Sequence, residues 1–427
     1  MSSLHLQEGC DVARMSQLPI TVVLGAFWIV VGDTLSQFEL GPISLSGAIT
    51  AVVAALTLLF LPSYAIQSAA LTQQLGPGAS AGARIPWPMW GFVLFVLLSF
   101  LFNAQNGAIT SSAIQNACVY LSFVGSIAFA AMTGSSLLVL RGWDLMRSFS
   151  TWYAYIALAL SLLTRGVGVV NDRLLGALHS PRALAMIGLV ALAAVIPGIP
   201  RNPWMKFAPF AIVAAMTFSL SRAATVIGLV SLIFLALRGK RLKHGQLTGF
   251  FLRAFAWLTM IALSSYWIIV HYAPFRDRFI AQHTTVRIGD LDFNTEGRAN
   301  IWGLLLHEAS DRWLLGHGVG SASQLVGETF TGLDQPHNEY LRFYFDYGVV
   351  GLALFIAGYL SLAWLTFRNA RNTNHPLHWA AFIGLLNIAL VAFTTNPFVF
   401  PWVMMSLGSL VGLSLALNRF ELLERAS

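Results

Sequence analysis

Long apolar runs alternate with short polar stretches along almost the whole chain. A helix needs about 20 mostly apolar residues to cross a bilayer, because its backbone groups must be hydrogen-bonded within the segment. Two runs, residues 18–38 and 182–197, are shorter or interrupted but still fit this length. The clearest runs cover residues 43–61, 87–103, 111–133, 144–164, 204–221, 223–237, 254–272, 347–367, 377–396 and 398–417. The pattern predicts an all-α integral membrane protein with about twelve transmembrane helices.

One long polar segment, residues 273–340, interrupts this pattern and holds nine of the eighteen acidic residues, five arginines and four histidines. Within it, apolar residues recur at helical spacing and predict a helix over residues 300–310. The apolar face of this helix comprises Ile301, Leu304, Leu305 and Ala309. The chain thus divides into nine transmembrane helices (1–272), a large loop (273–340), and three more helices with a tail (341–427).

The positions of lysine and arginine predict the orientation in the membrane. With both termini in the cytoplasm, fifteen of the 25 basic residues lie inside, including all three lysines and the basic run at residues 238–243. Thirteen of the eighteen acidic residues then lie outside. Residues 273–340 are therefore expected to face the periplasm as one large loop.

Composition fits this interpretation, since 56% of residues are hydrophobic and only 10% are charged, against about 25% charged in soluble proteins. The net charge of +7 follows from the cytoplasmic basic residues, which anionic lipids attract. We therefore expect membrane lipids, and not nucleic acid, as the partner of this charge. The first apolar run has no small-residue cleavage site, so we interpret it as a retained span.

Several familiar kinds of site are missing from the sequence. Cys10 lies in the amino-terminal tail and Cys118 inside a span, so we expect neither a disulfide nor a thiolate metal site. His307 and His317 do not have zinc-ligand spacing. The run Gly316–Gly320 lacks the features of a phosphate-binding loop, so we interpret it as a turn. We expect no cofactor and no metal.

Arg222 is the first candidate for chemistry. It stands in Phe218-Ser-Leu-Ser-Arg222-Ala, where one apolar run ends and the next begins on the outer side. A snorkelling arginine is the simpler interpretation. However, arginines are usually enriched on the cytoplasmic side of a membrane protein, and Arg222 is expected on the outer side. A planar guanidinium that binds phosphate oxygens would suit a lipid-linked phosphate at this level.

Arg298 is the second candidate, at the start of the predicted loop helix in Asn294-Thr-Glu-Gly-Arg298-Ala-Asn-Ile-Trp302. The amino-terminal end of a helix favours an anion, and an arginine adds to that field. A salt bridge to Glu296 or to another acidic residue of the loop is an equally good interpretation.

His337 is the third candidate, in Asp334-Gln-Pro-His337-Asn-Glu-Tyr340, just before the tenth span. A single histidine is more often a satisfied polar residue than a catalyst. Here it follows a proline and precedes aromatic residues typical of a membrane interface. An unperturbed imidazole is mostly neutral at pH 7 and can accept a proton.

Together these segments resemble the O-antigen ligase and polymerase superfamily, bacterial inner-membrane glycosyltransferases that use undecaprenyl-diphosphate-linked glycans. The resemblance extends from about residue 203 to residue 401, and it depends on the order and common side of several weak motifs. These are Ser221-Arg222, Gly297-Arg298 with Trp302, the Gly-x-Gly turn, and Pro336-His337-Asn338-x-Tyr340-Leu341.

The resemblance implies a metal-independent C-type glycosyltransferase fold whose periplasmic loop covers a cavity open to the outer leaflet. It implies that Arg222 and Arg298 bind the donor diphosphate and that His337 is the base. Asn338 and Tyr340, in the same motif, are candidate supporting residues. A ligase joins finished O-antigen to a sugar of the lipid A-core oligosaccharide, whereas a polymerase extends the glycan on its lipid carrier. Polymerases typically have two sizeable periplasmic loops, so the single large loop favours a ligase.

The candidate residues are also suited to this reaction when the family resemblance is set aside. A sugar hydroxyl needs its proton removed as it attacks, and His337 could accept that proton. The departing diphosphate needs charge neutralisation, which two arginines supply. Attack opposite the leaving group would invert the anomeric centre, with no need for a metal.

Three alternatives remain open. A polymerase would use the same residues, and a protein O-oligosaccharyltransferase would differ only in its acceptor, a Ser or Thr hydroxyl. A non-enzymatic transporter of lipid-linked sugars would require ionisable groups near the bilayer midplane. From Asn372 to Asn418 the chain has no Asp, Glu, Lys or Arg.

Overall fold

The computed structural model describes most of the predicted helices. Its described residues are 39–40, 43–105, 110–163, 169–170, 173–174, 181–198, 203–219, 221–238, 285–288, 291–294, 298–330 and 335–426, with 259, 263, 267 and 271 as single positions. The predicted spans at 18–38 and 254–272 lie outside them, apart from those four single positions in the second.

Six described helical segments are long and apolar enough to cross a membrane: Gly47–Leu75, Trp87–Gln105, Ser111–Ala131, Pro181–Gly198, Glu339–Thr373 and Pro401–Ala426. Three shorter apolar helices are Met205–Phe218, Arg222–Ile233 and Pro376–Val391. The multi-pass membrane character predicted from the sequence is therefore confirmed. The count of twelve and the three-part division of the chain stay predictions.

The helices of the membrane domain are α3 (Leu45–Leu75), α5 (Trp87–Gln105), α6 (Ser111–Ala131), α7 (Ser136–Leu163), α8 (Pro181–Val195), α9 (Pro203–Phe218), α10 (Arg222–Arg238), α15 (Glu339–Thr373), α16 (Pro376–Val391) and α17 (Pro401–Ala426). Short helical turns connect some of them: α4 (Pro77–Ser80), η2 (Ala81–Ala83), η3 (Ile196–Gly198) and η5 (Pro397–Val399). The described residues also form antiparallel strand pairs: β1 (Glu39–Leu40) with β2 (Ile43–Ser44), β3 (Val169–Val170) with β4 (Arg173–Leu174), and β5 (Thr285–Ile288) with β6 (Leu291–Asn294).

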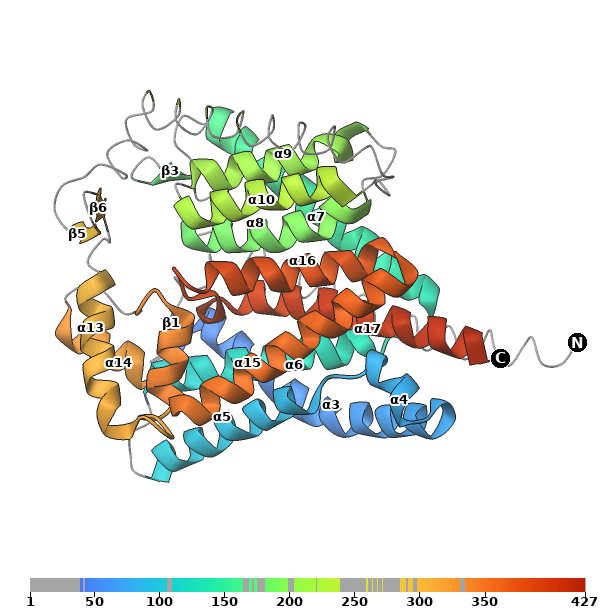
Figure 1. Ribbon diagram of the computed structural model, residues 1–427, viewed down its shortest axis with the longest axis horizontal. Helices are drawn as coiled ribbons and strands as arrows, with labels where there is room; N and C mark the ends of the chain where they lie inside the picture. Colours follow the sequence, from blue (N-terminus) through green and yellow to red (C-terminus); the bar gives the residue numbers. More distant parts are fainter. Residues whose placement is uncertain are drawn as a thin grey trace, which may run out of the picture.

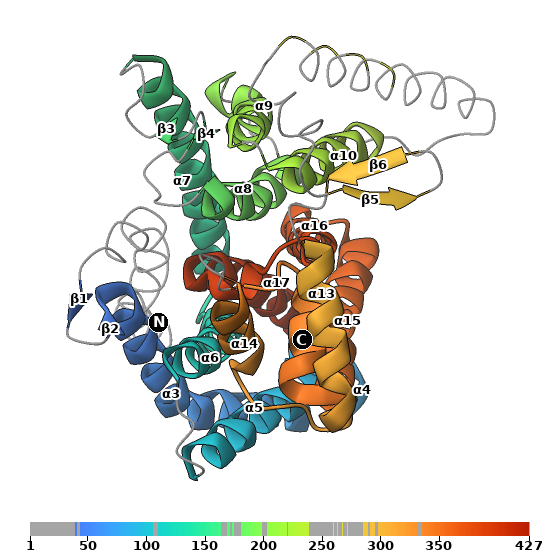
Figure 2. The ribbon, with the colours of Figure 1, turned by 90° about the vertical axis from the view of Figure 1, so that its left-hand side faces the viewer.

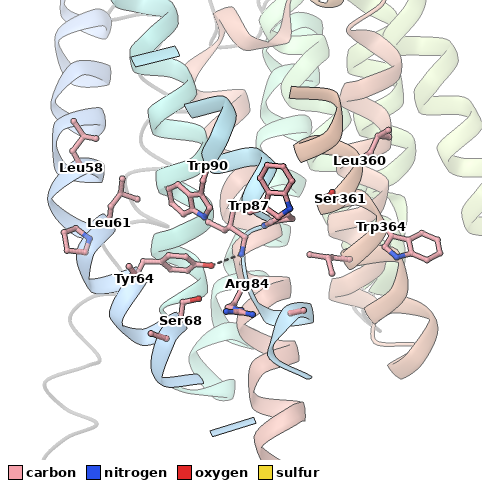
Figure 3. Close-up of a pocket in the computed structure, with 17 residues that line it drawn as sticks. Leu58, Leu61, Tyr64, Ser68, Arg84, Trp87, Trp90, Leu360, Ser361 and Trp364 are labelled. Atoms are coloured by element: carbon pink, nitrogen blue, oxygen red, sulfur yellow. Dashed lines mark hydrogen bonds between the residues drawn. The ribbon is translucent and has the colours of Figure 1, made fainter. Parts of the chain in front are cut away.

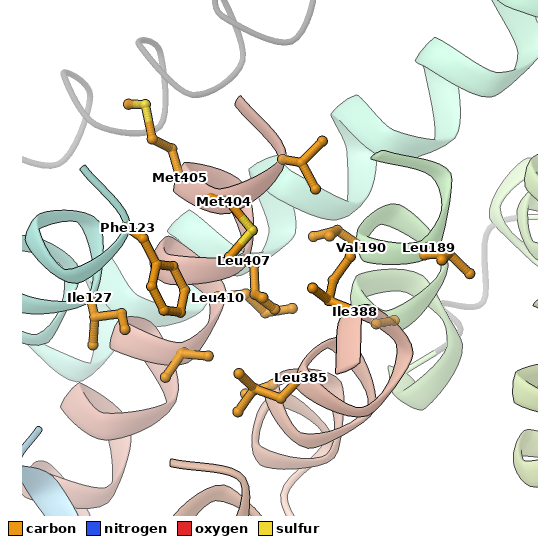
Figure 4. Packing of buried hydrophobic residues seen from close by; sticks show 14 of the residues in the cluster. Phe123, Ile127, Leu189, Val190, Leu385, Ile388, Met404, Met405, Leu407 and Leu410 are labelled. Carbon is orange, nitrogen blue, oxygen red and sulfur yellow. The ribbon is translucent and has the colours of Figure 1, made fainter. Parts of the chain in front are cut away.

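The core lies around α17, which packs against α6 on one side and against α8 and α16 on another (Figure 4). Its contact with α6 depends on small residues. A Cβ added at Gly408 would lie 2.6 Å from the carbonyl oxygen of Phe123, and one added at Gly412 would overlap that of Ile127. Small residues that let helix backbones approach closely are a common device for packing helices in membranes. Helices α7 to α10 form a further layer (Figure 1), in which α7 and α8 contact α17, and α8 and α10 contact α16.

Helix α15 is broken at Gly348, whose backbone angles (φ 63°, ψ −168°) are not helical. Around the break, the carbonyls of Phe345 and Asp346 accept hydrogen bonds from the amides of His317 and Gly318, at 2.9 Å each. The amides that follow Gly348 donate to the carbonyls of Trp313 and Leu314. The backbone groups exposed by the break are thus satisfied by the segment 313–318. The break fixes this segment beside α15.

Replacing Gly348 with alanine should destabilise the protein by about 2–5 kcal/mol, because this backbone region is essentially restricted to glycine and a Cβ would overlap the backbone of Leu314. Thermal unfolding in detergent would measure the loss. Gly303 is the matched control: it is helical and exposed, and no atom lies within 4 Å of an added Cβ. A Gly348→Ala protein as stable as Gly303→Ala would contradict this account.

The polar segment folds over the amino-terminal end of α15 as α13 (Arg298–Glu308), η4 (Ala309–Arg312) and α14 (Ser321–Thr329), as Figure 2 shows. The predicted loop helix is confirmed. Ile301, Leu305 and Ala309 are buried in a small hydrophobic cluster that is separate from the main core, and Leu304 is half-buried. The predicted turn is also confirmed, because all three glycines of the Gly316–Gly320 run have positive φ angles.

Candidate functional site

His337 lies directly before α15, in a backbone conformation that is rare for its residue type. Its φ angle is 57°, in the left-handed region, and its side chain is only 6% exposed. Its backbone amide donates a 2.6 Å hydrogen bond to Oδ1 of Asn396, a buried residue before η5. A histidine in this conformation is strained, and such strain persists only where neighbouring structure enforces it.

Asn338 and Tyr340, the candidate supporting residues, hold structure on either side of this point. Asn338 is the N-cap of α15, and its Oδ1 accepts a 3.0 Å hydrogen bond from the amide of Leu341. Such a cap typically contributes about 1 kcal/mol to helix stability. The hydroxyl of Tyr340 donates to the carbonyl of Ala389 at 2.8 Å. Both residues therefore fix the start of α15, and with it the backbone next to His337.

Arg298 and His337 belong to neighbouring elements. Arg298 is the first residue of α13 and is half-buried. One turn later, Nε1 of Trp302 donates a 2.8 Å hydrogen bond to the carbonyl of Pro336, the residue before His337. Helix α13 also packs against α15 (Figure 2). The tryptophan that follows Arg298 in the sequence thus connects its helix to the histidine segment.

Arg222 is the first residue of α10 and is half-buried. Helix α10 packs against α16, where the hydroxyl of Ser231 donates to Oδ1 of Asn387 at 2.8 Å. At the end of α16, the carbonyl of Ala392 accepts a 2.8 Å hydrogen bond from the amide of Glu339. Helix α10, which begins with Arg222, and helix α15, which begins just after His337, therefore both contact α16.

A buried ionic network beside His337 escaped the sequence interpretation. Glu339 and Arg342, both fully buried, form an ion pair one turn apart on α15. The guanidinium also donates to Oδ1 of Asn116 at 3.0 Å and to the hydroxyl of Tyr120 at 2.9 Å, both on α6. The other carboxylate oxygen of Glu339 accepts a 3.0 Å bond from Nδ2 of Asn396. Asn396 therefore joins this network to the backbone of His337.

One more turn along α15, the carboxylate of Asp346 lies at the amino-terminal end of α14. It accepts hydrogen bonds from the amides of Ala322 at 2.8 Å and Gly320 at 3.1 Å. A buried carboxylate at this end of a helix satisfies amides that have no partner within the helix. Asp346 thus fixes α14 against α15. The spacing of Glu339, Arg342 and Asp346 along one helical face was the signal in the sequence.

Within the described part of the chain, no group of three or more His, Cys, Asp and Glu side chains is placed to hold a metal ion. The acidic groups next to His337 are engaged as described, Glu339 with Arg342 and Asn396, and Asp346 with two backbone amides. The described arrangement therefore offers a buried histidine, fixed by its neighbours, close to a helix that begins with an arginine.

Comparison with known families gives a match to part of the chain. Residues 207–356 match the family described as O-Antigen ligase. The matched segment includes Arg222, Arg298 and His337. A comparison with curated proteins finds none that matches this chain. Members of the matched family are glycosyltransferase-like enzymes, ligases and polymerases, which act on lipid-linked polysaccharides in a membrane. Over residues 207–356 this multi-pass membrane protein is thus similar to the O-antigen ligase family.

Proposed function

We propose that this protein is an O-antigen ligase of the bacterial inner membrane with a C-type glycosyltransferase fold. It transfers O-antigen polysaccharide from undecaprenyl diphosphate to a sugar hydroxyl of the lipid A-core oligosaccharide, at the periplasmic face. His337 removes the proton of the acceptor hydroxyl, and Arg222 and Arg298 bind the donor diphosphate. The reaction inverts the anomeric centre and needs no metal.

The observation that carries this proposal is the conformation of His337. A left-handed non-glycine residue costs of the order of 1–3 kcal/mol, and such residues cluster at functional sites. Here the strained residue is a titratable one, and a capped helix and Asn396 hold it in place. A general base requires such fixed placement, because proton transfer depends on hydrogen-bond geometry with the substrate.

The proposed role of the arginines follows from the negative charge of the departing diphosphate. The bond from the anomeric carbon to the diphosphate oxygen breaks as the acceptor oxygen attacks, and the electron pair leaves with the diphosphate. Guanidinium groups neutralise this charge through paired, charge-assisted hydrogen bonds. Arg298 lies at the amino-terminal end of α13, where helix amides add to the positive field.

The test is the lipopolysaccharide of a deletion strain. Loss of a ligase leaves lipopolysaccharide without O-antigen, while long-chain O-antigen accumulates on its lipid carrier. Loss of a polymerase leaves a single O-unit on the core, and that profile would overturn the ligase assignment in favour of a polymerase. Normal lipopolysaccharide together with an unglycosylated surface protein would indicate a protein O-oligosaccharyltransferase instead.

A topology prediction accompanies this site. In a variant whose native cysteines are replaced by serine, Gln324→Cys should react with a membrane-impermeant thiol reagent added to intact spheroplasts. Gln324 is exposed on α14, so labelling reports sidedness and not burial. Arg371→Cys is the control, exposed at the end of α15 that is predicted to be cytoplasmic. Labelling of position 371 but not 324 would invert the topology.

Asn396 is expected to position His337. Asn396→Leu removes both the acceptor for the His337 amide and the donor to Glu339. We expect kcat to fall about 10–100-fold, since a small displacement of a reacting group has effects of this size. The KM for the donor should change little, because the arginines that bind it are untouched.

Asn387→Leu is the matched control for Asn396→Leu. Asn387 is also buried and hydrogen-bonded, to Ser231 and to the carbonyl of Leu189, but it lies within α16 and has no contact with the His337 backbone. It should lower thermal stability without a selective loss of kcat. Equal kcat losses in the two variants at matched membrane levels would show that Asn396 has a structural role only.

A further inference from the structure

A cavity of about 1200 Å³ opens between the second half of α3, the start of α5 and the second half of α15 (Figure 3). It is remote from the candidate site: along α15, Ser361 lies 13 residues beyond the break at Gly348 (361 − 348), roughly 20 Å at the rise of an α-helix. The lining is mainly apolar, with Leu58 and Leu61 from α3 and Leu360 from α15. This cavity, hereafter the α3–α5–α15 groove, is therefore a separate site.

One cation lines the groove. Nη1 of Arg84, which follows η2, donates a 2.6 Å hydrogen bond to the hydroxyl of Thr72. Among the residues that the structure describes, Arg84 forms no ion pair. A guanidinium has five N–H donors, so further donors are available to bind an anion. The described residues that line the groove include no Asp or Glu, so the charge that they contribute is positive.

The segment that carries Arg84 is held in place. The amide of Ile85 donates a 2.8 Å hydrogen bond to the hydroxyl of Tyr64 on α3, which Figure 3 shows beside the arginine. On the other side, Nδ2 of Asn369 in α15 donates to the carbonyl of Gly82 at 3.1 Å. The cation therefore sits on a backbone fixed to both walls of the groove, as expected of a pre-formed binding site.

Three tryptophans line the same groove as Arg84 (Figure 3). Trp87 and Trp364 are 76% and 62% exposed, and Trp90 is half-buried. Exposed tryptophans are enriched where hydrocarbon meets the lipid headgroups. The bias of basic residues predicts that this end of α3, α5 and α15 is cytoplasmic. With this orientation, the apolar part of the groove is expected at the depth of acyl chains and the cation at the depth of headgroups.

We propose that the α3–α5–α15 groove binds an anionic phospholipid of the cytoplasmic leaflet, with the phosphate on Arg84 and an acyl chain along Leu58, Leu61 and Leu360. The occupant is a lipid because the apolar lining opens among exposed apolar side chains of the same helices. It is anionic because the groove offers a guanidinium for the phosphate and no carboxylate for the ammonium group of a zwitterionic headgroup.

Native mass spectrometry of the full-length protein in detergent tests this, with phosphatidylglycerol and phosphatidylethanolamine of identical chains as probes. Wild-type protein should bind phosphatidylglycerol more tightly. Arg84→Gln should weaken its binding about five- to tenfold, the effect of one basic residue on an anionic lipid, and should leave phosphatidylethanolamine nearly unchanged. Arg84→Lys should retain part of the preference. Ala65→Trp, which places a large side chain in the groove, should weaken binding of both lipids.

Arg141→Gln is the matched control, because Arg141 is an exposed arginine on α7 outside the groove and is predicted to be on the same membrane side. It should bind both lipids like wild type. Equal affinity of the wild type for the two lipids, or equal effects of Arg84→Gln and Arg141→Gln, would overturn the proposal. Unchanged binding to Ala65→Trp would place the lipid elsewhere and also overturn it. If Ala65→Trp does not fold, the three arginine variants decide.

Discussion

His337→Ala should lower glycan transfer by about 10²–10⁴-fold, the usual cost of removing a general base. Donor binding should largely survive, because the proposed diphosphate contacts come from Arg222 and Arg298. The measurement is transfer by purified protein to lipid A-core acceptor at matched protein levels. A separate assay should measure binding of lipid-linked donor. An active His337→Ala protein would exclude this histidine as the base.

The backbone of His337 complicates an alanine substitution, since residues with a Cβ are strained at a φ of 57°. Asparagine tolerates the left-handed region better than alanine and still offers hydrogen-bonding groups, but it cannot accept a proton near neutral pH. His337→Asn should therefore preserve the loop and still lose transfer. If His337→Asn were active and His337→Ala inactive, the histidine would have a conformational role.

Two further experiments distinguish a catalytic base from a metal ligand and from a structural histidine. If His337 is the base, wild-type enzyme stays active in excess chelator, whereas activity lost to chelator and restored by a divalent ion would overturn this role. His317→Ala is the matched control within the same polar segment. Its ring stacks on Phe345 at 4.4 Å and contacts the carbonyl of Glu308. It should lower stability and leave kcat nearly unchanged.

Local pattern predicted the membrane helices and the loop helix, because apolar periodicity reports directly on burial. It was least accurate where polar side chains continue a helix. The span predicted at residues 144–164 belongs to α7, which begins at Ser136. The residues of α7 before the predicted span include Arg141, whose side chain is exposed. A helix can continue through such a charged residue, where a hydropathy pattern places the end of a span.

Tertiary contacts determined what the sequence could not predict. The network that fixes His337 joins α15 to Asn116 and Tyr120, more than 200 positions earlier in the chain, and to Asn396. Each of these residues is a polar position within or at the end of an apolar run, and nothing in the sequence links one to another. Only the fold shows that they satisfy one buried ion pair, and a buried charge requires such partners. The sequence singles out His337 and Arg298 as candidates, because His337 stands just before an apolar run and Arg298 at the start of a predicted helix; their roles stay predictions.

The two arginines provide the second large expected effect. Arg222→Ala and Arg298→Ala should each reduce transfer about 10–100-fold, since hydrogen bonds to a charged group contribute about 1.5–3 kcal/mol. Lysine should rescue poorly, because a point charge does not reproduce the paired geometry of a guanidinium. Arg312→Ala is the control, an exposed arginine of η4 in the same polar segment, and it should stay near wild-type activity.

A double variant tests whether both arginines act on one diphosphate. Groups that bind the same ligand are coupled, so the loss of activity in Arg222→Ala/Arg298→Ala should differ from the product of the single losses, whereas independent effects multiply.

The kinetic parameter that changes is also informative. Losing a contact that strengthens as the diphosphate departs lowers kcat, whereas losing a contact made equally before the reaction raises only KM. We expect the loss mainly in kcat, with coupling between the two positions. If Arg222→Lys kept full activity and the two losses multiplied independently, Arg222 would be a structural anchor at the start of α10, and Arg298 alone would contact the donor.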